Sequence, residues 1–240
     1  MSAGRPERDA LDHPEQQGPT EWPQPGDEVG VGPHPLPWPD DPRYDPELLA
    51  DGDRRNVVDR YRYWRRKAIV ADLDTLRFPF EVAIENLGHD YNIGTIVRTA
   101  NAFGAARVHI VGRRRWNRRG AMVTDRYQHL AHHEDAAALA VVTRAAGLVL
   151  VAVDNVPGAR PLETEPLPLR CVLMFGTEGA GLSAVARAVA DRSVTIAQFG
   201  STRSINVGVA AGIAMHSWIR QHAEVSTVSP KPSGRPGSPR

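Results

Sequence analysis

The chain has 240 residues and a formal net charge of +1 at pH 7, and 24% of its residues are charged while 41% are hydrophobic. These values are ordinary for a globular protein, and so small a net charge points to no particular partner. Lys67 and Lys231 are the only lysines among 29 basic residues. A GC-rich genome would give this bias without functional meaning, so the positions of the arginines matter more than their number. The single cysteine, Cys171, excludes an internal disulfide and a metal cage built from cysteines.

No apolar segment near the N-terminus has the pattern of a secretory signal. The longest apolar stretch, residues 205–219, is too short and too interrupted to cross a bilayer. We therefore expect a cytoplasmic protein without a membrane partner. His129, His132 and His133 lie close together, but carboxylates or cysteines at ligand spacing are missing around them, so we expect no metal site.

Proline divides the chain into regions. Eleven of the 20 prolines lie in residues 1–46 and four lie in residues 230–239. Residues 1–45 also lack apolar periodicity, so they cannot bury enough surface to offset the loss of chain entropy. We expect a disordered tail over residues 1–45 and another over residues 226–240.

Residues 46–79 are expected to form a basic, aromatic helical extension, with one helix that begins at Asp45 or Pro46 and ends near Leu76. Arginines and aromatic residues alternate in its central part: Arg54, Arg55, Arg60, Tyr61, Arg62, Tyr63, Trp64, Arg65 and Arg66. Two interpretations stay open. The helix is either solvated and packs Tyr61 and Trp64 on the body of the protein, or it is an arm whose guanidinium groups meet RNA phosphates and whose rings meet bases.

Short apolar runs alternate with amphipathic segments from residue 80 onward. The runs predict strands over residues 80–86, 107–112, 147–154, 170–175 and 193–197. Helices are predicted over residues 92–103, 120–130, 134–146, 183–190 and 205–222. Such alternation favours a parallel sheet with helices on both faces, and runs rich in Val, Ile and Leu are typical of strands buried on both sides. We predict an α/β domain over residues 80–225 with its functional site at the carboxyl ends of the strands.

The first of three polar clusters follows the first predicted strand and reads Asn86-Leu87-Gly88-His89-Asp90-Tyr91-Asn92-Ile93-Gly94. We expect Asn92 to cap the next helix. Arg98 lies on that helix, whose other residues are small and apolar, and an arginine there is unfavourable unless it has an anionic partner. The anionic partner of Arg98 is either a functional ligand or a carboxylate side chain with a structural role.

An arginine-rich loop follows the second predicted strand. It consists of Arg113, Arg114, Arg115, Arg118 and Arg119 around Trp116. Contact with phosphates explains this density better than a merely solvated loop.

The second polar cluster reads Phe175-Gly176-Thr177-Glu178-Gly179-Ala180-Gly181-Leu182-Ser183. Its glycines let the backbone run close to a ligand. No lysine follows, and the spacing G-x-G-x-x-G is absent, so neither a P-loop nor a dinucleotide fingerprint is present. Glu178 is placed to accept hydrogen bonds or to pair with Arg98.

The third polar cluster begins the last predicted helix and reads GSTRSINVGVAAG over residues 200–212. Ser204 is a candidate N-cap, and Ser201, Thr202 and Asn206 add further donors and acceptors near bare backbone N–H groups. Plain helix capping is the alternative explanation. Cys171 lacks the surroundings of a nucleophile.

In this order, the three clusters resemble the motifs of the SpoU/TrmH branch of the SPOUT RNA methyltransferases. The first motif resembles residues 92–100 with 103–105, the second resembles residues 174–182, and the third resembles residues 196–200 with 204–207. The chain departs from the family pattern at Ala197-Gln198, where Pro-Met is usual, and at Gly208, where Ser is common. Residues 1–79 do not suggest the folded RNA-binding domain that many relatives carry.

The resemblance implies methyl transfer from S-adenosylmethionine to RNA, most often to a ribose 2′-oxygen of tRNA or rRNA. It also implies a C-terminal deep trefoil knot and a homodimer, with the cofactor in the knot and catalytic groups from both chains. We expect Gly208 and Gly212 at the dimer interface. Methylation of a base nitrogen and a catalytically idle RNA-binding protein stay open, whereas the missing catalytic cysteine counts against methylation at pyrimidine C5.

The resemblance also implies catalytic and cofactor-binding residues, at the positions that match the family motifs. The catalytic set implied by the resemblance is Asn92, Arg98, Glu178, Ser204 and Asn206. The residues implied to hold the cofactor are Gly176, Ile196, Ser204 and Ile205. RNA contacts are expected from Arg113, Arg114, Arg115, Arg118, Arg119 and Arg203. Our hypothesis is that Arg98 binds the phosphate beside the target ribose and favours the developing alkoxide, while Asn92 and Glu178 hold Arg98 in place.

Overall fold

The computed structural model describes residues 30–88 and 92–224. Residues 1–29 of the tail expected over residues 1–45, the whole tail expected over residues 226–240, Val225, and the three residues His89, Asp90 and Tyr91 lie outside the described residues. The chain divides into two compact units, Met1–Tyr63 and Trp64–Arg240, so the predicted extension over residues 46–79 is shared between them.

The first unit contains α1 (Pro46–Asp51) and the short 3₁₀ helix η1 (Asp59–Tyr61). Residues 30–45 differ from the expected disordered tail, because they make regular contacts with the segment that follows. Val31 pairs with Asp53 in an antiparallel bridge, and the His34 amide donates to the Leu49 carbonyl at 2.9 Å. This stretch is therefore ordered despite its prolines.

The expected single helix over residues 46–76 is wrong. It is broken at Gly52, which has φ of +93°, and after the short 3₁₀ helix η1 the next α-helix is α2 (Arg66–Asp74). The buried carboxylate of Asp53 accepts hydrogen bonds from the backbone amides of Arg55 at 3.0 Å and Tyr63 at 2.9 Å. These bonds offer the backbone an alternative to the helix.

The basic aromatic stretch is largely committed to internal contacts. The Arg55 guanidinium donates to both oxygens of Asp53, and Arg62 donates to the Arg55 carbonyl at 2.6 Å. Tyr61 and Trp64 are both buried, which does not suit rings that meet RNA bases. Burial of the two rings counts against an RNA arm in which they meet bases.

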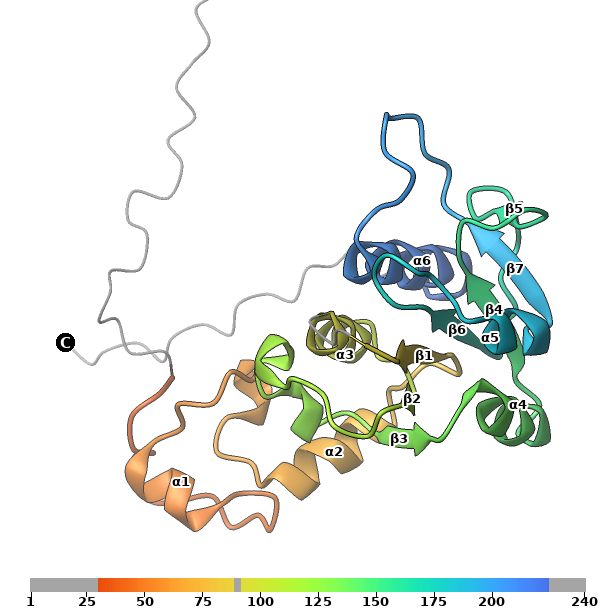
Figure 1. Ribbon diagram of the computed structural model, residues 1–240. Helices are drawn as coiled ribbons and strands as arrows, with labels where there is room; N and C mark the ends of the chain where they lie inside the picture. Colours follow the sequence, from red (N-terminus) through yellow and green to blue (C-terminus); the bar gives the residue numbers. More distant parts are fainter. Residues whose placement is uncertain (1–29, 89–91, 225–240) are drawn as a thin grey trace, which may run out of the picture. The chain divides into compact units, whose positions relative to one another are not determined.

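A seven-stranded sheet forms the centre of the second unit (Figure 1), with the order β3-β2-β1-β6-β4-β7-β5. Every pairing is parallel, which confirms the predicted parallel α/β fold. The strands are β1 (Glu81–Asn86), β2 (Val108–Gly112), β3 (Leu130–His133), β4 (Val149–Val153), β5 (Arg160–Pro161), β6 (Cys171–Phe175) and β7 (Arg192–Thr195). The sequence predicted all of them except β3 and β5.

Helices cover both faces of this sheet, as predicted (Figure 1). The helices after the first strand are α3 (Ile93–Ala102), α4 (Ala136–Ala145), α5 (Ala184–Val189) and α6 (Val207–His222). Alternate strand residues point to opposite faces. Side chains of one set pack with α3 and α6 in one core cluster, and those of the other set pack with α4 and α5 in a second cluster.

The helix predicted over residues 120–130 is wrong. The structure has two 3₁₀ turns there, η2 (Arg119–Ala121) and η3 (Thr124–Arg126), followed by β3. Met122 and Val123 both have positive φ, at 46° and 69°, which ends any right-handed helix. Packing fixes this turn, because a Cβ on Gly94 at the start of α3 would lie 2.6 Å from the Ala121 nitrogen.

The longest helix, α6, packs its aromatic end into the larger core. Trp218 is fully buried, its ring centroid lies 4.5 Å from that of Phe80, and its indole N–H donates to the Pro168 carbonyl at 3.1 Å. Within the described ranges, α6 and the other helices are all too short or too polar to cross a membrane.

Trp218→Ala tests this packing. We expect a loss of about 3–5 kcal/mol in the free energy of unfolding, because the change leaves a cavity and an unpaired carbonyl. Urea denaturation followed by circular dichroism measures it. The control Val141→Ala, at a side chain that is 71% exposed, is expected to change the stability by less than about 0.5 kcal/mol. Equal midpoints for the two variants would contradict the assignment of Trp218 to the core.

Candidate active site

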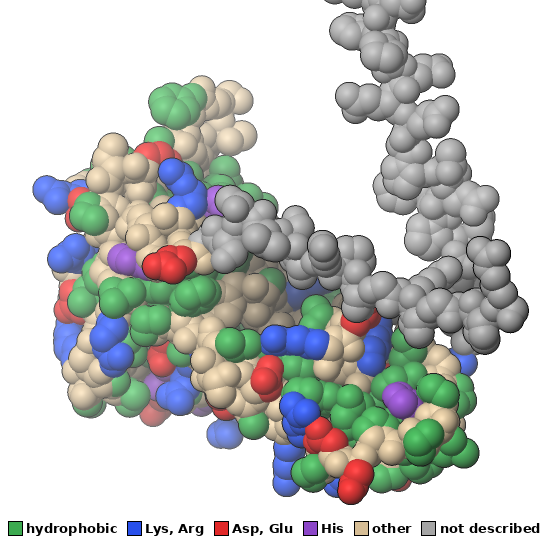
Figure 2. Space-filling model, turned by 180° about the vertical axis from the view of Figure 1, so that it is seen from behind, with side chains coloured by type: hydrophobic (Ala, Val, Ile, Leu, Met, Phe, Trp, Pro, Cys, Tyr) green, Lys and Arg blue, Asp and Glu red, His purple; other side chains and the backbone are tan. Residues whose placement is uncertain are grey.

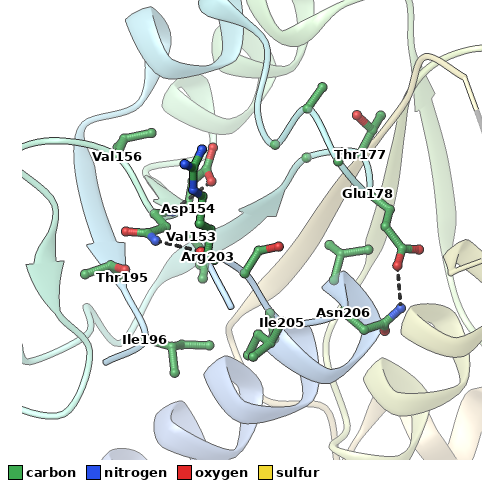
Figure 3. A pocket seen from close by; sticks show the side chains of 18 of the residues that line it. Val153, Asp154, Val156, Thr177, Glu178, Thr195, Ile196, Arg203, Ile205 and Asn206 are labelled. Atoms are coloured by element: carbon green, nitrogen blue, oxygen red, sulfur yellow. Dashed lines mark hydrogen bonds between the residues drawn. The ribbon is translucent and has the colours of Figure 1, made fainter. Parts of the chain in front are cut away.

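A cavity of about 690 Å³ lies at the carboxyl ends of β4, β6 and β7 (Figure 3). Its walls come from residues 153–156 after β4, from residues 176–181 after β6, and from parts of the segment 195–210 that links β7 to α6. Its volume lies in the range usual for small-molecule sites. The cavity is therefore where the sequence placed the functional site of a parallel sheet.

The glycine loop after β6 is a tight turn that only glycine permits at its base. Thr177 and Gly181 exchange two backbone hydrogen bonds of 3.0 Å, and a Cβ on Gly176 would lie 2.0 Å from the Gly181 carbonyl carbon. Gly181 has φ of +66°. Gly176, expected to hold a cofactor, thus shapes one wall of the cavity.

Asp154 fixes this loop to the end of β4. One of its carboxylate oxygens accepts from the Leu182 amide at 2.9 Å, and the other accepts from the Asn155 amide at 2.8 Å. The sequence reasoning gave Asp154 no role. A carboxylate at the end of a buried strand is the signal that could have identified it, since neighbouring parallel strands end at the same edge.

Three predicted catalytic residues meet through hydrogen bonds. The Asn92 side-chain amide donates to Glu178 Oε2 at 2.6 Å, and the Asn206 amide donates to Glu178 Oε1 at 3.2 Å. The same Asn206 nitrogen also lies 3.1 Å from Asn92 Oδ1. We call these three side chains the amide–carboxylate cluster. It joins the starts of α3 and α6 to the glycine loop.

The N-cap of α6 is Asn206, so the expectation that Ser204 caps this helix is wrong. Asn206 Oδ1 accepts from the backbone amides of Gly208 at 2.9 Å and Val209 at 3.3 Å. Asn92 does precede α3, but its side chain makes no capping bond and turns to Glu178. Ser204 instead lines the cavity.

Arg98 does not join the cluster. It is exposed on α3 and makes no hydrogen bond or ion pair with any residue that the structure describes, so the expected pairing with Glu178 is not formed. The geometry of a helix explains this. Six residues separate Arg98 from Asn92, and at 3.6 residues per turn they point to different sides of the helix.

Gly208 and Gly212, which were expected at a dimer interface, face α3 of the same chain. A Cβ on Gly208 would lie 3.3 Å from Thr95 Cγ2, and one on Gly212 would lie 3.9 Å from Thr99 Cγ2. Gly208 therefore lets α6 approach α3 closely enough for Asn206 to reach Asn92.

The arginine-rich loop after β2 has a fixed backbone and exposed side chains. Asn86 donates from its side chain to the carbonyls of Arg113 at 2.6 Å and Arg115 at 2.9 Å. All five arginines of the loop are exposed. Arg118 pairs with Asp125 at 3.0 Å and lies over the Trp116 ring. Sequence reasoning missed the role of Asn86 in holding this loop.

Basic side chains do not dominate the face of the molecule that Figure 2 shows. Figure 2 shows one face of the molecule, on which basic and acidic side chains are interspersed with hydrophobic ones. This agrees with a net charge of +1 and leaves local clusters of arginine as the places for anions to bind.

The other residues expected to hold a cofactor also line the cavity. Ile196, Ser204 and Ile205 are in its wall, as is Arg203, which had been grouped with the RNA contacts. Gln198 lies there too, and its Oε1 is buried without a hydrogen-bond partner in the described chain. An unsatisfied acceptor in the wall suits a ligand that brings a donor.

Cys171 and the clustered histidines all have surroundings within the described chain that can be stated. Burial raises the pKa of the Cys171 thiol to about 12, so it stays protonated. His129 binds Asp74, His132 binds a backbone carbonyl, and His133 binds His109. In the described ranges no group of three or more potential metal ligands gathers.

The fold is that of an α/β protein with a cavity at the carboxyl edge of a parallel sheet. The chain belongs to the SpoU rRNA Methylase family, whose sequence profile matches residues 79–216. The family resemblance drawn from the three motifs is therefore confirmed.

Several named proteins are similar to this chain. An uncharacterized tRNA/rRNA methyltransferase of Mycolicibacterium vanbaalenii is 30% identical over 75% of this chain and 60% of its own length. The tRNA (guanosine(18)-2'-O)-methyltransferase of Escherichia coli K12 is 28% identical over 65% of this chain and 70% of its own. The AdoMet-bound rRNA methyltransferase of Sinorhizobium meliloti superposes with a TM-score of 0.53 at 28% identity, over 62% of this chain and 59% of its own.

The chain spans only part of some relatives. It covers 60% of the Mycolicibacterium vanbaalenii protein and 46% of a similarly named protein of Mycolicibacterium gilvum. The shared region is thus not the whole of those proteins.

Gly176→Ala tests the glycine loop. We expect the added methyl group to break the Thr177–Gly181 pair, because it would overlap the Gly181 backbone. Hydrogen exchange of these two amides is expected to rise at least about tenfold, measured by NMR or mass spectrometry. Gly200→Ala is the matched control, since a Cβ there meets nothing within 4 Å. Unchanged protection in Gly176→Ala would refute this account of the turn.

Proposed function

We propose that this chain is an S-adenosylmethionine-dependent RNA methyltransferase that acts on a ribose 2′-oxygen of tRNA or rRNA. The observation that carries the proposal is the amide–carboxylate cluster, in which one residue from each of the three family motifs meets the others beside the cavity. The names of the relatives support RNA methylation, and one of them specifies the 2′-oxygen.

S-adenosylmethionine suits the cavity, and it supplies a methyl group on a sulfonium when bound. Gly176, Ile196, Ser204 and Ile205 would hold it, largely through backbone contacts. The unpaired Gln198 acceptor fits a ligand that carries amino and hydroxyl donors. Two related structures, from Sinorhizobium meliloti and Streptomyces viridochromogenes, are described as bound to AdoMet.

Arg98 is proposed to bind the phosphate beside the target ribose and to favour the developing alkoxide. A guanidinium keeps its proton at neutral pH, so Arg98 acts here as a cation and not as a base. Glu178 does not hold it, because both oxygens of that carboxylate accept from Asn92 and Asn206. The two amides thereby fix the carboxylate and leave the Arg98 guanidinium available for an anion.

A homodimer is proposed, with Arg98 of one copy completing the site of the other. Apolar side chains near the cavity support it, since Phe199 is 97% exposed and Val209 and Ile213 of α6 are also exposed.

A C-terminal trefoil knot is proposed because the chain belongs to this family. It is supported by the way the segment before α6 shares one cavity with the loops after β4 and β6.

RNA contact is proposed for the arginine-rich loop, where Asn86 holds the backbone and the guanidinium groups stay exposed. Arg113, Arg114, Arg115, Arg118 and Arg119 would bind phosphates and so contribute affinity without reading sequence. The family domain over residues 80–225 would carry the catalysis.

Nucleoside mapping tests the reaction. Comparing tRNA and rRNA from a deletion strain and its parent is expected to show the loss of one 2′-O-methylated nucleoside in the deletion strain. Loss of a base-methylated nucleoside would refute the ribose assignment. Tight RNA binding without calorimetric binding of S-adenosylmethionine would instead indicate a catalytically idle protein.

Arg98→Lys tests the role of the guanidinium. We expect the rate of methyl transfer to fall about 10²–10³-fold, since one electrostatic contact to the transition state is lost, while the affinity for S-adenosylmethionine stays the same. Arg160→Lys on β5 is the control, because Arg160 is exposed and does not line the cavity. Near-normal turnover of Arg98→Lys would exclude bidentate phosphate positioning.

A further inference from the structure

Arg203 is the one charged residue of the third polar cluster, residues 200–212, and the proposed mechanism does not use it. We infer that its guanidinium binds the α-carboxylate of the S-adenosylmethionine methionyl group, and so positions the cofactor. This inference rests on the proposed function. It replaces the sequence-based expectation that Arg203 contacts RNA.

The backbone of Arg203 is fixed at the wall of the cavity. Asn155, which follows β4, donates from its side chain to the Arg203 carbonyl at 3.0 Å (Figure 3). Ser204 and Ile205, the next two residues, line the same cavity and are proposed cofactor contacts. Figure 3 shows the Arg203 side chain among those that line the cavity. Arg203 is thus held next to the residues that are proposed to bind the cofactor.

Of the charged side chains that line the cavity, all except Arg203 have hydrogen-bond partners within the described chain. Asp154 accepts from the amides of Asn155 and Leu182, and both oxygens of Glu178 accept from the amide–carboxylate cluster. Arg187 donates to the Leu182 carbonyl. The Arg203 guanidinium, in contrast, makes no hydrogen bond or ion pair with the described part of the chain. Its donors therefore remain available to a ligand.

S-adenosylmethionine has an anionic group that can pair with the Arg203 guanidinium. S-adenosylmethionine carries a sulfonium, an ammonium and one carboxylate, so the carboxylate is its only anionic group. Arginine presents a planar fork of donors that pairs with a carboxylate through two parallel hydrogen bonds. The proposed RNA phosphates have a separate set of arginines in the loop after β2. A carboxylate in the cavity is consequently the ligand group that Arg203 fits best.

Calorimetry with two ligands isolates this contact. The full-length wild-type protein and Arg203→Gln are titrated with S-adenosylmethionine and with decarboxylated S-adenosylmethionine, which lacks only the carboxylate. We expect Arg203→Gln to weaken binding of S-adenosylmethionine about tenfold or more, as is typical for a hydrogen bond to a charged group. Binding of the decarboxylated ligand is expected to change by less than about twofold, because it has no group for Arg203 to hold.

Two controls keep the result specific. Arg160→Gln, outside the cavity, is expected to bind both ligands as the wild type does. Thermal melting of Arg203→Gln is expected to match the wild type, since the side chain is exposed. RNA affinity, measured in parallel by filter binding, is expected to stay within about twofold of the wild-type value.

The outcomes separate this inference from the proposed function. If Arg203→Gln weakens both ligands equally, or weakens RNA binding alone, the carboxylate contact is refuted while the methyltransferase proposal stands. If the wild type binds neither ligand, the proposed function fails and the inference fails with it. A selective loss for S-adenosylmethionine supports both.

Discussion

The carboxylate of Glu178 is the interaction on which the site depends, because it joins three segments that lie far apart in the sequence. It accepts from Asn92, which is 86 residues away, and from Asn206, which is 28 residues away. Asn206 is also the N-cap of α6, so its side chain serves the helix and the cluster at once. The starts of α3 and α6 and the glycine loop are therefore positioned together, and Gly208 provides the close approach that this requires.

The cluster holds a carboxylate with neutral amides, and this has an electrostatic consequence. Had Arg98 paired with Glu178, the ion pair would have neutralised both groups. With Asn92 and Asn206 as donors instead, the Glu178 carboxyl group is held by neutral amides, while Arg98 and Arg203 remain available to anionic ligands. Such an arrangement suits the proposed function, in which the site would receive a cationic sulfonium and an anionic RNA backbone side by side.

Hydrophobic patterns predicted the interior of this fold because they report burial. The run Cys171–Phe175 is buried throughout and reads as a central strand, which it is. In contrast, β3 (Leu130–His133) carries two histidines, and the pattern before it suggested a helix that Met122 and Val123 interrupt with positive φ. The motif residues could be singled out because each polar cluster is a short continuous stretch of sequence. Contacts between distant segments could not be predicted, since a hydrogen bond such as that from Leu182 to Asp154 depends on which strands are neighbours in the sheet.

The order of the strands places the polar segments that follow them in a row along one edge of the sheet. Read from β2 to β7, the order is β2-β1-β6-β4-β7, and in a parallel sheet all carboxyl ends share that edge. The arginine-rich loop follows β2, Asn92 follows β1, Glu178 follows β6, Asp154 follows β4, and Arg203 follows β7. The proposed RNA contacts therefore lie at one end of the line and the proposed cofactor contacts at the other. The amide–carboxylate cluster stands between them, which is where a group moving from cofactor to RNA would have to pass.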